Sequence, residues 1–350
     1  MKSILESYSI LLGSSIGQAL KVMDKNNRKL LIIVDEQQKY SGLLSIGDIQ
    51  RAILKGVDLN KCLREIMRED YIIAKSGDSR DEVRNRMFAI RAEFMPIIDD
   101  YGQIVDIISW EDLFENNRDI PVDQFNIPVV IMAGGLGTRL RPLTNVLPKP
   151  LIPVGDKTML EEIFNRFTKH GCDNFYISVN YKADLISFYL DSLKLPYRTK
   201  CFVEDNPLGT AGSLHLLNGE IESTFFVSNC DILIEDDYAK ILRYHKENGN
   251  EITIISAYRH MSIPYGTLEV GENGKLIALK EKPDLSFSIN TGMYILEPHL
   301  LKEIPKNKFY HITHLIGEVL TRNGKVGVFP VSEKSWKDIG TWDEYIRNFS

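Results

Sequence analysis

A short apolar run that ends in closely spaced glycines constrains this chain more than any other feature of its sequence. Residues 129–133, VVIMA, are long enough for a buried strand. Three glycines follow at once: Gly134, Gly135 and Gly137. Glycines at the carboxyl end of a strand open a loop in which backbone N–H groups approach a phosphate with no Cβ in the way. Arg139 and Lys149 add positive charge nearby. The segment therefore predicts a loop that holds a nucleoside triphosphate.

A plain strand-to-helix turn is the alternative interpretation of these glycines. Their spacing differs from the dinucleotide pattern G-x-G-x-x-G, and no Walker G-K-[ST] follows. However, a plain turn does not require Thr138, Arg139 and Arg141 directly after the glycines. This clustering of polar and cationic side chains favours a triphosphate site.

Short apolar runs alternate with amphipathic segments after residue 128. The runs at 175–179, 199–203, 225–229 and 252–258 predict buried strands, and residues 158–171 predict a helix that Gly171 closes. Such alternation predicts an α/β fold with a doubly wound, mostly parallel, Rossmann-like sheet. Ligands bind such sheets at the carboxyl ends of the strands, where the glycine loop lies.

The composition is that of an ordinary soluble globular protein, with 43% hydrophobic and 26% charged residues among 350. This length predicts two or three domains. The net charge of −6 disfavours a nucleic-acid surface, and no apolar stretch reaches membrane-spanning length. The four cysteines show no C-x-x-C spacing, which favours reduced thiols over a zinc or disulfide framework. We expect a cytoplasmic protein that contacts neither nucleic acid nor membrane.

The first 120 residues contain an internal repeat. Residues 29–53 align with residues 93–116 without a gap, and each copy predicts a strand, a polar turn, a strand, Ser-x-x-Asp and a helix. An amphipathic helix precedes each copy, at 14–26 and at 79–92. Because one hairpin flanked by helices buries its apolar face poorly, we expect the two copies to pack on each other.

The Ser-x-x-Asp pairs of the repeat are Ser45 with Asp48 and Ser109 with Asp112. A serine at the start of a helix can act simply as its N-cap. Alternatively, the aspartate accepts hydrogen bonds from a ribose while helix N–H groups meet a phosphate. The repeat resembles a tandem pair of CBS domains, which implies that these four residues bind a regulatory adenine nucleotide, AMP or ATP. The predicted domains are 1–60 and 61–118, followed by a linker at 119–127 and a catalytic domain at 128–350.

Two acidic residues stand at the ends of apolar segments further along the chain. Asp231 follows the run 225–229, and Asp338 precedes a helix expected to start near Thr341. Either aspartate could be a helix N-cap. If the fold brings them together, their oxygens would hold Mg²⁺ against the phosphates of a triphosphate.

The blocks of the catalytic segment resemble, in order, those of the sugar-1-phosphate nucleotidyltransferases. The blocks are GGLGTRLRPLT, PKPLIPV, EDNPLGTAGS, the Asp231 loop, YGTLEV, EKP, NTGMYIL and WKDIGT. The resemblance implies that Asp231 and Asp338 bind the metal and that Arg139, Lys149 and Lys282 are catalytic.

The resemblance also implies two sets of substrate-binding residues. The nucleotide set is Gly134, Gly135, Gly137, Thr138, Glu204, Gly209 and Thr210, and the sugar-phosphate set is Gly266, Glu281, Lys282, Asn290 and Thr291. Cys230 departs from the family, which usually has glycine before the metal aspartate.

Glu204 bears on the identity of the base. Related uridylyl- and thymidylyltransferases tend to carry glutamine there, which offers one donor and one acceptor. A carboxylate offers acceptors only, which suits the N1–H and N2–H₂ donors of guanine and favours GTP. The alternative is that Glu204 points to solvent beside Asp205. Nucleotidyltransferases preceded by CBS pairs resemble bacterial enzymes that make GDP-glucosamine for legionaminic-type sugars, which implies glucosamine 1-phosphate as acceptor.

Two other functions stay open. One is uridylyl, thymidylyl or cytidylyl transfer on the same fold. The other is a nucleotide-sensing regulatory subunit whose transferase-like domain has lost catalysis, although the five charges at Arg139, Lys149, Asp231, Lys282 and Asp338 argue against it. Because CBS pairs often associate through their helices, we expect a homo-oligomer.

Overall fold

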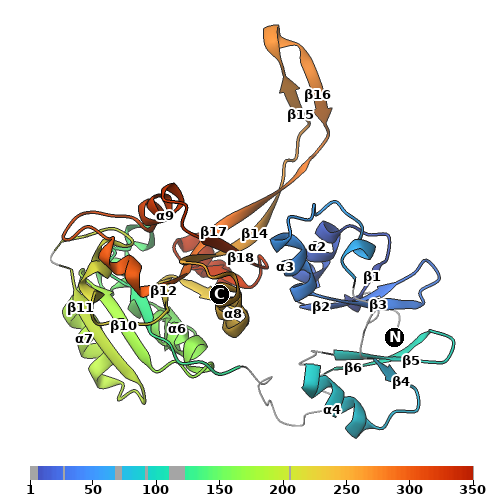
Figure 1. Ribbon diagram of the computed structural model, residues 1–350, viewed down its shortest axis with the longest axis horizontal. Coiled ribbons are helices and arrows are strands. Elements are labelled where there is room, and N and C mark those ends of the chain that lie inside the picture. The colour runs from blue at the N-terminus through green and yellow to red at the C-terminus, as the bar shows by residue number, and fades with distance from the viewer. Residues whose placement is uncertain are drawn as a thin grey trace. The chain divides into compact units, whose positions relative to one another are not determined.

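The structure is a computed structural model that describes residues 7–26, 28–67, 73–90, 94–109, 123–204 and 206–349. The chain divides into two compact units, Met1–Val122 and Asp123–Ser350, and the boundary falls inside the predicted linker. In Figure 1 the first unit runs from blue to blue-green and the second from green to red. No helix in the described ranges is both long and apolar enough to cross a bilayer.

The first unit contains two small sheets with the same topology (Figure 1). In each, a short strand pairs in parallel with the first strand of an antiparallel hairpin. The strands are β1 (Ser9–Leu11), β2 (Leu30–Val34), β3 (Tyr40–Ser45), β4 (Ala74–Lys75), β5 (Phe94–Ile98) and β6 (Ile104–Ser109). The helices are α2 (Ile16–Asn26), α3 (Ile46–Leu54) and α4 (Arg80–Ile90). The helix predicted before each hairpin, both hairpins and the helix after the first hairpin are confirmed, while the helix predicted after Ser109 lies outside the described residues. β1 and β4 are too short to give a periodic signal.

The two repeats of the first unit share a core. Phe94 of the second repeat is fully buried in the same cluster as Ile32 and Leu43 of the first. Its ring also packs edge-on against Tyr8, with 4.7 Å between the ring centroids. The Tyr40 N–H donates to the carbonyl of Gly102 across the repeats at 3.0 Å. The prediction that the two copies pack on each other is therefore confirmed.

The second unit is built around a seven-stranded sheet in the order β11-β10-β7-β12-β17-β14-β18. β17 runs antiparallel to both its neighbours, and the other adjacent strands are parallel. The strands are β7 (Val129–Met132), β10 (Asn174–Val179), β11 (Arg198–Val203), β12 (Phe225–Asn229), β14 (Ile252–Ser262), β17 (Asp284–Leu296) and β18 (Val326–Val331). The predicted α/β fold with a mostly parallel sheet is confirmed.

Helices cover both faces of this sheet. They are α6 (Met159–Thr168), α7 (Ala183–Ser192), α8 (Tyr238–Asn248), α9 (Ile312–Thr321) and α10 (Trp342–Phe349). Because strand residues alternate between faces, Val129 and Ile131 of β7 join a core with α6 and α8, while Val130 joins a second core with α9. Both cores include residues with no exposed surface, so β7 lies at the centre of the unit. The first unit also has a short 3₁₀ helix at Leu63–Glu65. Those of the second unit are at Thr138–Leu140, Leu143–Asn145, Lys149–Leu151, Gly212–Leu217, Glu272–Gly274 and Pro298–Lys302.

A two-stranded arm projects from the second unit (Figure 1). β14 and β17 stay paired beyond the sheet as far as Ser262 and Asp284. The hairpin of β15 (Thr267–Val270) and β16 (Leu276–Lys280) then continues the arm. The strand predicted at 252–258 is therefore longer than expected, because its outer part pairs with β17 rather than ending at the sheet.

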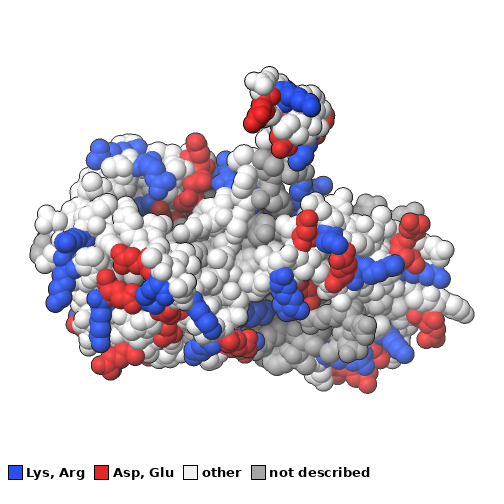
Figure 2. All heavy atoms as spheres, turned by 45° about the horizontal axis from the view of Figure 1, so that its top comes forward, with Lys and Arg blue, Asp and Glu red and all other residues white. Residues whose placement is uncertain are grey.

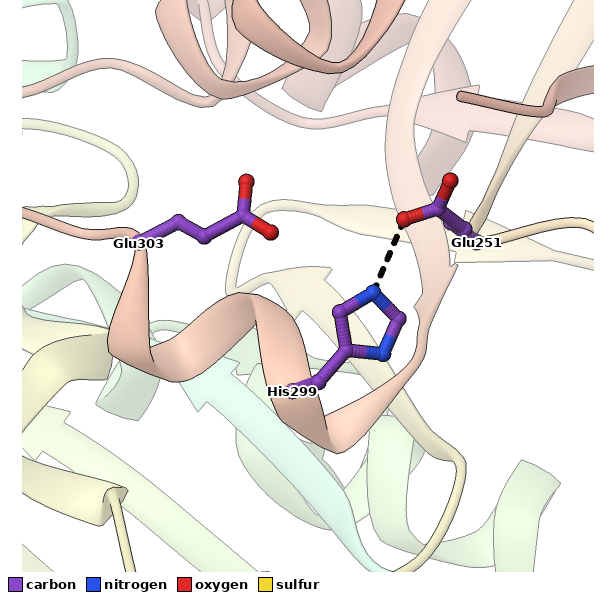
Figure 3. A group of neighbouring side chains, drawn as sticks. All are labelled: Glu251, His299 and Glu303. Atoms are coloured by element: carbon purple, nitrogen blue, oxygen red, sulfur yellow. Dashed lines mark hydrogen bonds and ion pairs between the residues drawn. The ribbon is translucent and has the colours of Figure 1, made fainter. Parts of the chain in front are cut away.

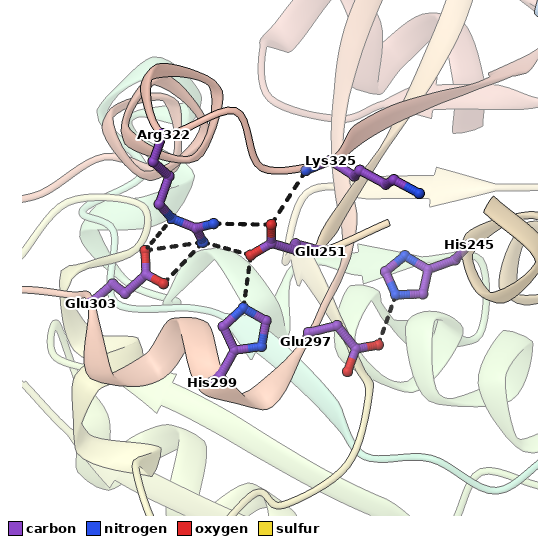
Figure 4. Close-up of polar contacts among 7 residues, drawn as sticks. All are labelled: His245, Glu251, Glu297, His299, Glu303, Arg322 and Lys325. Atoms are coloured by element: carbon purple, nitrogen blue, oxygen red, sulfur yellow. Dashed lines mark hydrogen bonds and ion pairs between the residues drawn. The ribbon is translucent and has the colours of Figure 1, made fainter. Parts of the chain in front are cut away.

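A polar network lies at the edge of the sheet where β14 begins (Figure 4). Arg322 binds Glu251 and Glu303, and His299 Nε2 lies 2.8 Å from Glu251. Hydrogen bonds from Arg322 lower the pKa of Glu251 to about 2, so its carboxylate stays ionised in any mild buffer. Above pH 4.5 its stabilising contribution is fully present, and it is lost as the pH falls towards 2.

A buried histidine lies beside this network (Figure 4). His245 is 1% exposed, with Nδ1 2.8 Å from Thr253 Oγ1 and Nε2 3.0 Å from Glu297 Oε1. In the neutral ring, Nε2–H donates to the carboxylate and Nδ1 accepts from the hydroxyl. Burial lowers the pKa of His245 below its usual 6.5, although Glu297 opposes this shift.

We expect His245→Phe to lower the free energy of unfolding at pH 7 by about 2 kcal/mol, because Thr253 and Glu297 lose a buried partner. Wild type should also lose stability as the pH falls below 6.5, since the unfolded chain then binds a proton that the folded ring takes up only at lower pH. The variant should lose less over that range. Urea unfolding at pH 7 and pH 5 measures both effects. The exposed His314→Gln serves as the control, and equal pH dependence in wild type and His245→Phe would contradict the assignment.

Candidate active site at the carboxyl edge of the sheet

The glycine loop leaves β7 at the carboxyl edge of the sheet and folds back onto the segment that follows it. Gly137 has φ 62°, in the left-handed region. A Cβ at Gly137 would lie 2.8 Å from Thr144 Cγ2 and 3.3 Å from Lys149 Cβ, so only glycine fits. The Thr144 hydroxyl donates to the Gly137 carbonyl at 2.9 Å. In contrast, nothing lies within 4 Å of the Cβ position at Gly135. Thr138 and Arg139 then begin a 3₁₀ helix and are exposed.

The structure brings Asp231 and Asp338 together, although they are far apart in the sequence. β13 (Ile232–Ile234) pairs antiparallel with β19 (Trp336–Asp338), which places Ile232 opposite Asp338. The N–H of Ile339 also donates to the Asp231 carbonyl at 2.8 Å. A Cβ at Gly340 would lie 2.8 Å from Asp338 Oδ1 and 3.2 Å from Asp231 Oδ2, so both carboxylates border the same point.

Neither aspartate is the N-cap of a helix. Asp231 precedes a strand, and the next helix, α8, is capped by Asp237. At α10 it is the hydroxyl of Thr341 that accepts from the N–H of Glu344, at 3.4 Å. The Asp338 carboxylate instead accepts from the N–H of Gly340 at 2.7 Å. The helix-cap alternative is therefore wrong for both residues.

Lys149 and Arg139 connect the glycine loop to the two carboxylates. Lys149 Nζ donates to Asp231 Oδ2, and Arg139 Nη2 lies 3.9 Å from the same oxygen. The Lys149 side chain is 11% exposed, whereas that of Arg139 is 62% exposed and free to meet a ligand. Burial raises the pKa of Asp338 and the charge of Asp231 adds to this effect, while the Gly340 N–H opposes it. Two partly buried carboxylate groups that share one point are a donor set that suits a hard cation such as Mg²⁺.

Glu204 is buried beside the glycine loop rather than exposed to solvent. Its side chain is 4% exposed, and a Cβ at Gly134 would lie 2.8 Å from Glu204 Oε1. The hydroxyl of Ser178 donates to the same oxygen, and the N–H of Leu208 donates to Oε2 at 3.0 Å. The alternative of a solvent-facing Glu204 is therefore wrong. Ser213 Oγ lies 3.1 Å from Ser178 Oγ and extends the network.

Gly209 and Thr210 contact the start of α9. Gly209 has φ 83°, and a Cβ there would lie 2.8 Å from the Tyr310 carbonyl. The Thr210 hydroxyl oxygen accepts from the N–H of Ile312 at 3.1 Å. These contacts fix the position of the loop that carries Gly209, while the Thr210 side chain is occupied by the helix.

The residues predicted for the sugar phosphate fall into two groups. Asn290 and Thr291 lie in the sheet, where the buried Thr291 hydroxyl donates to the Ile255 carbonyl at 2.7 Å. Gly266, Glu281 and Lys282 lie on the arm, and a Cβ at Gly266 would lie 2.9 Å from Glu281 Oε2. Strand pairing runs from Ser256–Asn290 outward to Ser262–Asp284. At about 3.3 Å per residue this stretch spans roughly 20 Å, and Lys282 and Glu281 lie further out still.

In the first unit, the Ser45 and Asp48 side chains form a capping box at the start of α3. The Ser45 N–H and hydroxyl both donate to the Asp48 carboxylate, which Arg51 also contacts. In this structure Ser45 and Asp48 therefore cap the N-terminus of α3, as the N-cap interpretation predicts. Ser109 is the last residue of β6, and Asp112 lies outside the described residues.

A second group of possible metal ligands lies elsewhere (Figure 3). Ligand atoms of Glu251, His299 and Glu303 lie within 4.8 Å of one another. Arg322 already binds both carboxylates, so an ion-pair network accounts for this group. It also lies at the opposite edge of the sheet, because Ile252 and Phe225 both pair with Leu296 at the start of their strands.

Two aromatic residues of the C-terminal helix hold the glycine-loop region, and no sequence motif predicted them. Trp342 Nε1–H donates to the Arg141 carbonyl at 2.6 Å, and the Tyr345 hydroxyl donates to the Pro153 carbonyl at 2.9 Å. Ser178 was also missed, because it lies inside an apolar strand pattern. Cys230 packs in the core, and burial raises the pKa of its thiol to about 12, so it is an inert space-filling residue.

Two family models match the chain. Residues 128–350 match nucleotidyl transferase, and residues 6–55 and 63–119 each match the CBS domain. A UTP–glucose-1-phosphate uridylyltransferase from Synechocystis is 31% identical over 235 residues, covering 62% of this chain and 61% of that protein. A probable mannose-1-phosphate guanylyltransferase from rice, Oryza sativa, is 31% identical and covers 62% of both chains. The chain therefore spans about three fifths of the length of these curated relatives.

Solved structures resemble the second unit. HddC from Yersinia pseudotuberculosis has a TM-score of 0.51 and 27% identity, covering 63% of this chain and 97% of that one. The same protein complexed with GMP-PN gives a TM-score of 0.51 and 26% identity.

We expect Lys149→Met to lower the free energy of unfolding by about 3 kcal/mol in EDTA, because Asp231 then remains buried beside Asp338 with only the exposed Arg139 3.9 Å away. Added Mg²⁺ should raise the Tm of this variant more than that of wild type, since the ion replaces the missing charge. Thermal unfolding with and without Mg²⁺ measures both changes. Lys306→Met, at an exposed lysine, is the control. No extra response to Mg²⁺ would mean that the carboxylates do not form a cation site.

Proposed function

This chain belongs to the nucleotidyl transferase family, and we propose that it transfers GMP from GTP to a sugar 1-phosphate, releasing pyrophosphate. One observation carries the proposal. The glycine loop, through Lys149 and Arg139, meets the Asp231–Asp338 pair at the carboxyl edge of the sheet. A loop open to phosphates and a carboxylate pair for a divalent cation are the two parts that such a transfer needs.

The reaction requires no general base. A sugar 1-phosphate is largely dianionic at neutral pH, since the second pKa of a phosphate monoester is about 6. Its oxygen attacks the α-phosphorus of the triphosphate in line. A new P–O bond forms, the bond to the β-phosphate oxygen breaks, and pyrophosphate leaves. The protein therefore has to position two anions and reduce their repulsion.

The side chains of the site divide this work. Gly134, Gly135 and Gly137 let backbone N–H groups reach the triphosphate, and Arg139 and Lys149 supply positive charge beside it. Asp231 and Asp338 would hold Mg²⁺, which neutralises phosphate charge when bound. Lys282, on the arm, supplies the cation for the sugar phosphate. Trp342 fixes the backbone at Arg141 and so positions the loop.

Glu204 supports guanine as the base. Its carboxylate is held by Ser178 and Leu208 against Gly134, at the start of the triphosphate loop. Each oxygen keeps a further lone pair for the N1–H and N2–H₂ donors of guanine. The rice guanylyltransferase and the HddC complex with GMP-PN agree with this choice. The Synechocystis uridylyltransferase is the reason for testing UTP beside GTP.

Two finer points belong to the same proposal. We propose glucosamine 1-phosphate as the acceptor, because the sequence resembles nucleotidyltransferases with CBS domains in front that make GDP-glucosamine. We also propose that the CBS pair binds an adenine nucleotide through Ser45, Asp48, Ser109 and Asp112, and that this binding changes the rate of transfer. Ser45 and Asp48 would then contact the ligand in addition to capping α3.

Pyrophosphate release with a panel of nucleoside triphosphates and sugar 1-phosphates, with and without AMP, tests the proposed function. GTP with glucosamine 1-phosphate should give the highest rate, and AMP should change it. Asp231→Asn should lose about 100-fold or more in turnover while staying folded by circular dichroism. The exposed Asp191→Asn is the matched control. Release with UTP, dTTP or CTP instead would favour a different transferase, and no release from any pair would favour a nucleotide sensor.

Glu204→Gln tests the assignment of the base. An amide offers one donor and one acceptor, so the variant should lower the ratio of kcat/KM for GTP over UTP by about 10-fold or more, because a guanine donor is left facing an N–H group. Glu222→Gln, at an exposed glutamate, should leave the ratio unchanged. If the ratio were also unchanged in Glu204→Gln, Glu204 would have no part in base selection.

A further inference from the structure

We propose that the arm, residues 258–289, works in trans, so that in a pair of chains each arm completes the sugar-phosphate site of the partner. This inference rests on the proposed function, because it concerns the binding site for the second substrate. It identifies the occupant of the arm's apolar surface as a second copy of this chain.

The arm starts at the catalytic edge of the sheet. β17 pairs with β12 so that Ser228 lies opposite Met293. A Cβ at Gly292 would lie 2.5 Å from Asn229 Nδ2, which places the base of the arm beside the segment that leads to Asp231. From Asn290 the arm runs outward for roughly 20 Å before it reaches Asp284. It therefore carries the Gly266–Glu281 pair and Lys282 away from the phosphate loop of its own chain.

The hairpin at the tip of the arm has no core of its own. Six large apolar side chains are each more than half exposed: Tyr265, Leu268, Val270, Leu276, Ile277 and Leu279. Leu268 and Leu279 are direct cross-strand partners, so apolar groups sit side by side on one face. An isolated two-stranded hairpin is at best marginally stable in water, and it needs a further surface to pack against.

The size of this apolar surface fits a dimer. The six side chains are 53–74% exposed, which is an apolar surface that a standard protein interface, with roughly 800 Å² per partner, has room to bury. Monomeric proteins rarely expose contiguous apolar patches larger than a few hundred square ångströms, and larger patches mark interaction sites.

The charges of the hairpin favour another copy of itself over a highly charged partner. Glu269 and Glu272 are balanced by Lys275 and Lys280, and Figure 2 shows acidic and basic groups together at the tip. Around a two-fold axis, an acidic group of one arm can face a basic group of the other. A partner of one charge sign would meet repulsion from half of these groups.

Exchange of arms also solves a chemical problem at the site. A sugar 1-phosphate is an anion that has to approach the triphosphate, and a cation that faces it lowers the repulsion. Within the described part of one chain, Lys282 lies eight residues from Asn290, roughly 26 Å along an extended strand. An arm that arrives from a partner would bring Lys282 and Glu281 to the end of the sheet where Gly292 approaches Asn229, close to Asp231.

Paired variants with two affinity tags test exchange directly. The first pair combines an Asp231→Asn chain with a Lys282→Ala chain. In trans, the intact body of one chain meets the intact arm of the other, so this pair should regain about half of the wild-type turnover. If each arm serves its own chain, both sites stay defective and no activity returns.

The second pair is the matched control, and it combines wild type with a chain that carries both substitutions. In trans, every site then has one defect, and turnover should be nearly lost. Arms that act within their own chain would leave about half of the wild-type turnover, because one site stays intact. The proposal would be overturned if this second pair kept turnover or if the first pair showed none. Failure to capture any mixed pair would overturn it as well.

A measurement without catalysis separates failure of this proposal from failure of the proposed function. In hydroxyl-radical footprinting, Tyr265 should be protected at high protein concentration and become reactive on dilution. Phe188 of α7, which is 76% exposed, should react at every concentration. If wild type released no pyrophosphate, the proposed function would fail, and footprinting would still decide on the arm. Tyr265 that reacts as readily as Phe188 at the highest concentration would overturn arm exchange.

Discussion

The ion pair between Lys149 and Asp231 is the contact on which the arrangement of this site depends. It ties the segment after the glycine loop to the end of β12. The pairing of β13 with β19 then brings Asp338 to the same point from the end of the chain. Trp342 completes the closure by binding the loop backbone at Arg141. Lys149, with Arg139 at a longer distance, thus faces two partly buried carboxylates, and the glycine-loop region is held by residues from both ends of the second unit.

The two edges of the seven-stranded sheet serve different purposes. At the edge where β14 begins, Glu251, Glu303 and Arg322 satisfy one another, and the buried His245 adds a neutral link through Glu297. Because these groups are paired with one another, they stabilise the fold and do not form a ligand site. At the carboxyl edge, Gly135 is open and Arg139 is exposed. The open and exposed groups of this site therefore lie where parallel strands end, which is where ligands bind such sheets.

The same edge also sends out the arm, which under our proposal would link catalysis to assembly. Antiparallel pairing of β14 with β17 carries Glu281 and Lys282 away from the sheet together with a large apolar surface. A surface of this size and balanced charge suits a second copy. In that arrangement, assembly and the binding of the second substrate would depend on the same hairpin. The CBS pair in the first unit has a separate, shared core around Phe94.

The sequence by itself determined the repeat, the mostly parallel sheet and the position of the glycine loop after its first strand, because periodicity and glycine spacing act over a few neighbouring residues. It also marked Asp231 and Asp338 one at a time. Only the tertiary structure decided that they meet, since their contact depends on pairing between distant strands. It also decided that Glu204 turns inward to Ser178, and that β14 and β17 run past the sheet. Side-chain direction and strand length beyond a sheet are set by partners remote in the chain, which no local pattern encodes.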